Sequence, residues 1–144
     1  MKMAYYRVIS IGYQRRSIDE LIAMLKEHSV KKVIDVRELP TSRRVDFRKN
    51  VLKSHLAAAG IQYQHVKDAG NPYRKVEGDF EYCMSLYSSY LANHPAVIEQ
   101  ISAAISEEAV AIFCYEREHD QCHRSILIER LTTTMPDIDL VKVE

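Results

Sequence analysis

Short apolar runs and amphipathic segments alternate along the chain, and this pattern predicts strands and helices in turn. The runs that suit strands cover residues 6–12, 31–37, 61–66, 109–115 and 138–143. Between them, apolar residues recur at the three- and four-residue spacing of a helix. Strands that alternate with helices are typical of an α/β domain around a mostly parallel sheet. We therefore expect a single α/β domain over residues 1–144, with a mostly parallel sheet of about five strands flanked by helices.

Local signals indicate where several helices begin and end. Ser17 and Glu20 form a capping-box pattern at the start of the first helix. The second helix is followed by Gly60, the residue type that is favoured just after a helix. Two further helices are expected before the fourth strand, and the second of them opens at Pro95, a favoured first-turn residue.

The polar loops that follow three of the strands are expected to lie together. Ligands of open α/β sheets bind outside the carboxyl ends of the strands. The loops after the first, second and fourth strands cover residues 13–17, 37–44 and 114–124. These loops and the strand ends before them contain the candidate functional side chains, which are Tyr13, Arg15, Ser17, Asp35, Arg37, Ser42, Arg43, Glu116, Cys122, His123 and Arg124. The sequence therefore predicts one composite site at the carboxyl edge of the sheet.

Composition narrows the class of protein only a little. The 144 residues carry 20 Lys and Arg against 20 Asp and Glu, so the net charge indicates no partner. Basic residues are nevertheless concentrated in residues 31–53. No apolar run approaches the roughly 18 residues that cross a bilayer, so we expect no membrane partner. Three cysteines without framework spacing fit reduced thiols, and we expect a cytoplasmic protein. The sequence specifies neither a cofactor nor an oligomeric state.

The last helix supplies the first functional hypothesis, which is anion binding. Asp120 is expected to be its N-cap, with the helix running from about residue 122. Cys122, His123 and Arg124 then lie in the first turn, where free amides and the helix dipole attract anions. An arginine fork suits phosphate, and arginines of the two other loops can approach. We expect the binding, with or without processing, of a phosphate-bearing ligand, such as a nucleotide or a nucleic acid, in an arginine-rich pocket.

The first alternative is a thiol-dependent enzyme. A cysteine in the first turn of a helix and beside cations can have a pKa of about 3.5–7.5, and Cys122 fits that description. His123 could act as its base or acid. Glu116 could work in acid–base catalysis, or it could orient arginines. Cys114 and Cys83 are expected to be structural residues of the core.

A metal site and an interaction module complete the alternatives. Cys114, His119, Cys122 and His123 are soft ligands, but their spacing is not a zinc-finger pattern. Adjacent side chains on a helix also diverge by about 100°, so Cys122 and His123 should not converge. We therefore expect no metal site. In the remaining alternative, a non-catalytic interaction module, the charged cluster stiffens the fold through internal salt bridges.

Four segments of the chain resemble signatures of the domain-of-unknown-function family DUF488. They cover nearly the whole chain in family order and read SIGYQRRSIDEL (10–21), VIDVRELPTSRRVDF (33–47), LAAAGIQYQHV (56–66) and IFCYEREHDQCHRSILIERL (112–131). The fold that the resemblance implies agrees with the α/β prediction, and it implies no reaction. The family's Leu-Gly-Gly or Leu-Gly-Asn-Pro element appears here as Ala69-Gly70-Asn71-Pro72, so we expect this loop to pack differently.

Overall fold

The structure is a computed structural model of the chain and describes residues 5–144. Its centre is one sheet of five strands in the order β3-β2-β4-β1-β5. All neighbouring strands pair in parallel. The strands are β1 (Tyr6–Gly12), β2 (Val30–Asp35), β3 (Gln62–His65), β4 (Ala109–Cys114) and β5 (Ile138–Val143). The expected α/β class with a parallel sheet is confirmed.

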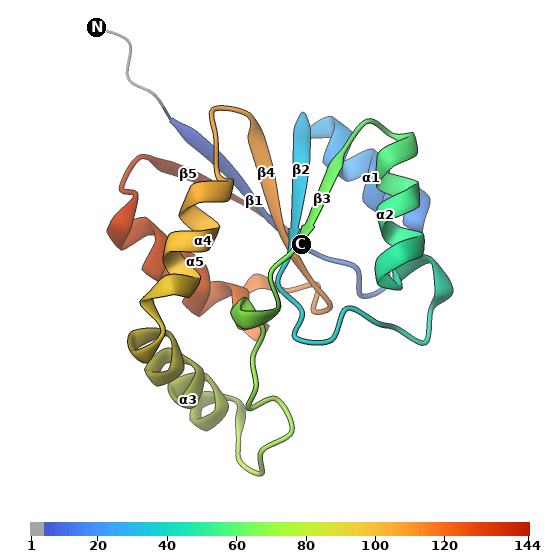
Figure 1. Cartoon of the computed structure of the whole chain (residues 1–144). Helices are drawn as coiled ribbons and strands as arrows, with labels where there is room; N and C mark the ends of the chain where they lie inside the picture. The colour runs from blue at the N-terminus through green and yellow to red at the C-terminus, as the bar shows by residue number, and fades with distance from the viewer. Residues whose placement is uncertain (1–4) are drawn as a thin grey trace, which may run out of the picture.

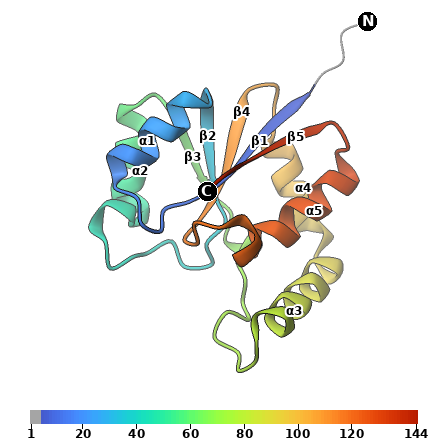
Figure 2. The same ribbon diagram turned by 180° about the vertical axis from the view of Figure 1, so that it is seen from behind.

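Helices cover both faces of the sheet, as Figures 1 and 2 show. One face carries α1 (Ile18–Glu27) and α2 (Lys49–Ala58), and the other carries α4 (Pro95–Ala104) and α5 (Arg124–Thr134). The remaining helix, α3 (Phe80–Asn93), lies beyond the carboxyl edge of the sheet, at the bottom of Figure 1. Short 3₁₀ helices span Val45–Phe47, Lys67–Ala69 and His119–Gln121. Across residues 5–144, no helix combines the length and apolar character that a bilayer crossing requires.

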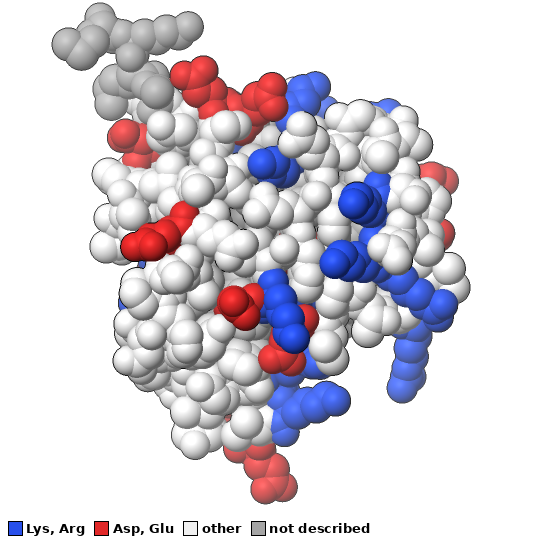
Figure 3. Space-filling view, in the orientation of Figure 1, with Lys and Arg blue, Asp and Glu red and all other residues white. Residues whose placement is uncertain are grey.

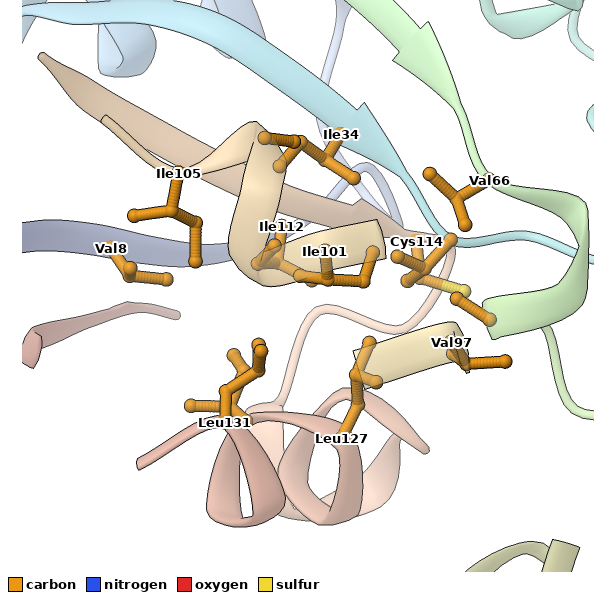
Figure 4. Packing of buried hydrophobic residues seen from close by; sticks show 14 of the residues in the cluster. Val8, Ile34, Val66, Val97, Ile101, Ile105, Ile112, Cys114, Leu127 and Leu131 are labelled. Carbon is orange, nitrogen blue, oxygen red and sulfur yellow. The ribbon is translucent and has the colours of Figure 1, made fainter. Parts of the chain in front are cut away.

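Alternating side chains of the strands form a hydrophobic core on each side of the sheet. Figure 4 shows Val8, Ile34 and Ile112, from three neighbouring strands, on the side of α4 and α5. Ile9 and Val33, which neighbour them in sequence, belong to the core on the side of α1 and α2. Because both faces of the sheet are buried at its centre, β4 is a continuous apolar run, AVAIFC. The edge strands β3 and β5 contain polar residues.

Two of the expected helix boundaries are confirmed by their capping contacts. The Glu20 amide donates to Ser17 Oγ at 3.0 Å, and the Ser17 amide donates to Glu20 Oε1 at 3.3 Å. These reciprocal bonds are the predicted capping box of α1. Gly60 follows α2 with a φ of 76°, a backbone conformation that glycine adopts without strain.

The expected start of the last helix is wrong in one important respect. Asp120 does not cap α5, because it lies inside the 3₁₀ helix His119–Gln121. Cys122 then has an extended backbone, with φ −133° and ψ 149°, and His123 is the N-cap of α5. Cys122 therefore does not lie in the first helical turn, and its side chain takes a direction that a helical backbone would not give it.

Gly12 generates the first testable prediction. A Cβ atom at this position would overlap the carbonyl oxygen of Glu116, in the loop after β4. Gly12→Ala should therefore lower the free energy of unfolding by about 3 kcal/mol, the upper end of the usual cost of overpacking, because the backbone must move. Gly60→Ala is the control, since an added Cβ meets nothing within 4 Å and costs only its positive φ, about 1–2 kcal/mol. Urea unfolding measures both, and equal losses would contradict the close strand–loop contact.

Candidate functional site

A pocket of about 470 Å³ opens at the carboxyl edge of the sheet. Tyr13 lines it after β1, and Arg37 lines it after β2. Cys114, Glu116 and His123 line it from the end of β4 and the loop that follows. The volume lies within the roughly 300–1,000 Å³ of typical small-molecule sites. Loops from separate parts of the chain thus form one concave surface at the place where the sequence predicted a site.

The predicted site residues divide into three groups. Those that line the pocket are Tyr13, Arg37, Glu116 and His123. Those that are buried and contact a lining residue are Asp35, Cys122 and Arg124. Those outside the lining are Arg15, Ser17, Ser42 and Arg43. Two residues of the third group make hydrogen bonds within their own segments. Ser17 caps α1, and Ser42 Oγ accepts from the Arg44 amide at 3.0 Å.

Arg37 is held by a buried carboxylate. Its Nε and Nη2 donate to the carboxylate of Asp35 at 2.9 and 2.7 Å, and its Nη1 donates to the Phe47 carbonyl at 2.7 Å. The Tyr63 hydroxyl also donates to Asp35, at 2.5 Å. Burial alone would lower the pKa of Arg37, but the hydrogen bonds and charge of Asp35 outweigh it and raise the pKa. The guanidinium therefore stays charged, and its donors are already engaged.

Arg124 is completely buried, at 0% exposure. Its Nε donates to Ser10 Oγ at 2.9 Å, and its Nη2 donates to the carbonyl oxygen of Glu116 at 2.7 Å. His119 Nδ1 lies 2.7 Å from the same Ser10 hydroxyl. Within residues 5–144, Arg124 Nη1 has no hydrogen-bond partner. The side chain therefore joins β1 to the loop after β4 and is not exposed to the pocket.

Two thiols and one imidazole form a compact group, which we call the thiol cluster: Cys114, Cys122 and His123. His123 Nδ1 lies 3.7 Å from Cys122 Sγ and 3.9 Å from Cys114 Sγ. His123 Nε2 lies 2.9 Å from the carbonyl oxygen of Val36. A carbonyl only accepts, so Nε2 carries the hydrogen and, in the neutral ring, the Nδ1 lone pair faces both sulfurs. All three residues are buried.

The backbone of Cys122 explains why this cluster forms. The expectation that the adjacent Cys122 and His123 side chains diverge is wrong, because Cys122 is extended rather than helical. Cys114 belongs to the buried core on the side of α4 and α5, as expected of a structural residue, whereas the core position expected for Cys83 is wrong. Cys114 lines the pocket, and Cys83 is only partly buried in its wall, 3.6 Å from the Val76 carbonyl. Cys114 thus serves the core and the pocket wall at once, and Cys83 serves the pocket wall alone.

The pKa values of the thiol cluster and of Glu116 are shifted by burial and by one another. Burial, followed by the charge of Cys122, raises the pKa of Glu116 to about 7. Burial also opposes ionisation of Cys122, but its contacts with Cys114 and His123 outweigh this and lower its pKa. The hydrogen bond to Cys122 and burial raise the pKa of Cys114. Burial lowers the pKa of His123, yet the neighbouring Cys122 outweighs it and raises that pKa. These shifts favour a Cys122 thiolate next to an imidazolium.

One wall of the pocket escaped the sequence analysis. It comes from residues 71–84, a segment dense in turn residues that leads into α3. Asp79 caps this helix by accepting from the Tyr82 amide at 2.8 Å, a local signal that indicates where α3 starts. Nothing in the local pattern indicates that α3 leaves the faces of the sheet. Ala69, in the unusual loop element, is buried and accepts from the Tyr87 hydroxyl at 2.6 Å.

Comparison with known proteins gives one match. A family model described as a domain of unknown function, DUF488, matches residues 17–131. No curated protein and no solved structure matches the chain significantly. The matched residues include the thiol cluster, Glu116, Arg37 and Arg124.

The buried role of Arg124 generates a prediction. Arg124→Lys should lower the free energy of unfolding by about 2 kcal/mol or more, because lysine cannot reach Ser10 and Glu116 together and hydrogen bonds to charged groups contribute about 1.5–3 kcal/mol each. Arg43→Lys is the matched control at an exposed position, where the change should stay within about 0.5 kcal/mol. Urea unfolding compares the two, and equal stability of both variants would show that Arg124 does not brace the loop.

Proposed function

The chain belongs to the DUF488 family, a domain of unknown function, and on that premise we propose that it is an enzyme whose substrate is a small organic molecule. The substrate binds in the carboxyl-edge pocket, and the thiol cluster with Glu116 acts on it. One observation carries the proposal: Cys114, Cys122, His123 and Glu116 converge at a pocket of about 470 Å³.

The thiol cluster and Glu116 are buried at a cost in free energy, and this cost supports a catalytic role. Polar and charged groups lose hydration when they are buried, and the loss is repaid only by good partners. Glu116 Oε2 is buried and, in the part of the chain that the structure describes, has no hydrogen-bond partner. If the side chain at this position only filled space, an apolar residue would do so without losing hydration. Groups with shifted pKa values in a cleft are typical of catalytic sites.

The lining of the pocket favours a substrate with an apolar part and a polar part. Leu39, Phe80 and Tyr115 are 50%, 41% and 45% exposed, and all three line the pocket. Acidic and basic groups are mixed in the same lining, as in the pair of Arg74 and Glu38, whose side chains lie 3.4 Å apart. Such a surface suits a neutral or zwitterionic organic molecule better than a polyanion.

A second candidate function is the binding of a phosphate-bearing ligand, above all a nucleic acid. Inside the pocket the arginine donors are largely engaged by the protein itself, which weakens this candidate there. Outside it, Figure 3 shows Lys and Arg gathered on the side of the molecule that α2 covers. The exposed basic residues in and just before α2 are Arg43, Arg44, Arg48, Lys49 and Lys53. A basic surface of this kind favours phosphate backbones without reading sequence.

A conversion assay tests the enzyme proposal. The purified protein is incubated with nucleobases, nucleosides, nucleotides, sugar phosphates and amino acid amides, and products are detected by mass spectrometry. We expect conversion of at least one compound, and a fall of about 10²–10⁴-fold in His123→Gln, because a proton-transfer group is lost. His55→Gln is the matched control, since this ring lies on α2 and contacts Asp46 at 3.0 Å, outside the pocket.

The variants must be folded for this comparison, which circular dichroism and thermal unfolding establish. Cys122→Ser supplies an independent second variant in the cluster and should also be inactive. Conversion of no compound by the wild-type protein, or equal conversion by wild type, His123→Gln and Cys122→Ser, would contradict the proposal.

A further inference from the structure

We infer that the thiol cluster is a binding site for a zinc-class divalent ion, with Cys114, Cys122 and His123 as its three protein ligands. The inference deepens the proposed function, because it concerns the same side chains and assigns them the role of metal ligands. It rests on the proposed function only for the claim that the pocket receives a substrate.

The distances within the cluster are close to those of a zinc site. The three ligand atoms all lie within 4.8 Å of one another, and the imidazole nitrogen lies 3.7 and 3.9 Å from the two sulfurs. A thiolate sulfur about 2.3 Å from zinc and an imidazole nitrogen about 2.0–2.1 Å from it lie about 3.5 Å apart in tetrahedral geometry. The two nitrogen–sulfur distances are therefore only a few tenths of an ångström longer than in a zinc site.

The surroundings of the cluster hold its donor atoms in position. The Nε2–H of His123 donates to the Val36 carbonyl at 2.9 Å, which leaves Nδ1 as the metal-binding nitrogen. The Tyr87 ring packs edge-on against the imidazole, with 5.1 Å between the ring centroids. The backbone amide of Arg124 lies 3.5 Å from Cys122 Sγ, to which it donates. Contacts of this kind orient ligands and tune their basicity in metal sites.

A divalent ion also balances the buried charge. Two thiolates and the Glu116 carboxylate would face the single guanidinium of Arg124 at this site. The two charges of a zinc-class ion would offset this negative charge within the buried cluster. Thiolate and imidazole ligands suit zinc and exclude magnesium and calcium, which prefer oxygen ligands.

Three protein ligands leave a fourth position, as in catalytic zinc sites. Cys114 and His123 line the pocket, so an ion held by the cluster would lie beside the space that a substrate would enter. Glu116 lines the same pocket and is not one of the three ligands. Zinc-dependent nucleobase deaminases combine a His/Cys/Cys zinc site with a non-ligand glutamate two residues after one ligand. The segment Cys114-Tyr115-Glu116 has this spacing, which gives Glu116 the place of a proton carrier.

Cobalt substitution tests the site directly. Wild-type protein is dialysed against a chelator and titrated with Co²⁺ while its absorption spectrum is recorded. We expect one equivalent to bind, with the intense visible bands of tetrahedral cobalt and a thiolate-to-cobalt charge-transfer band, both removed by adding Zn²⁺. Cys122→Ser and Cys114→Ser should each lose the charge-transfer band in part and bind more than 100-fold more weakly, beyond the about 10–100-fold typical of lost outer contacts. Cys83→Ser is the matched control and should bind like the wild type.

Folding of each variant is checked by circular dichroism, and the wild-type titration is decisive even where a variant does not fold. A folded wild-type protein that gives no cobalt bands, or bands that persist unchanged in folded Cys122→Ser and Cys114→Ser, would overturn the metal site. The conversion assay, run on metal-free and zinc-loaded protein, separates the two proposals. Conversion without cobalt binding would overturn the metal site alone, whereas cobalt binding without conversion would overturn the proposed enzyme function alone.

Discussion

The buried guanidinium of Arg124 is the contact on which the site depends. It donates to the Ser10 hydroxyl, on β1, and to the Glu116 carbonyl, in the loop after β4. Parallel pairing places the ends of β1 and β4 side by side, but it does not by itself fix the loop that follows. Because one rigid, charged fork contacts both segments, the loop that carries Glu116, Cys122 and His123 takes a defined position over the sheet edge.

The other arginines at the carboxyl edge also bind the protein itself. A guanidinium at a sheet edge can either receive an anion or tie the chain together, and its donors cannot do both. Arg37 donates to Asp35 and Phe47, and Arg44 donates to the carbonyls of Tyr13 and Arg16. The arginines therefore form a scaffold, and the groups left to do chemistry are sulfur, imidazole and carboxyl. The anion-binding hypothesis stays a prediction, and its best remaining support is the exposed basic side chains between residues 43 and 53, before and on α2.

The sequence predicted the scaffold well and the cluster poorly, for physical reasons. Strand periodicity and the Ser17–Glu20 capping box are local, so they predicted the five strands and the start of α1 correctly. The direction of the Cys122 side chain depends on a short 3₁₀ helix and one extended residue, which no periodic pattern announces. The wall formed by residues 71–84 depends on where α3 packs, which is a tertiary property. The pocket therefore opens at the edge that strand periodicity indicates, whereas the arrangement of its side chains depends on tertiary packing.

X-ray absorption at the zinc edge is the most direct measurement of the central claim, that the loop braced by Arg124 brings two sulfurs and one imidazole nitrogen to a single point. On zinc-loaded protein we expect a sulfur shell of two atoms at about 2.3 Å and a nitrogen or oxygen shell at about 2.0–2.1 Å. A first shell of nitrogen and oxygen alone, without sulfur, would contradict the claim.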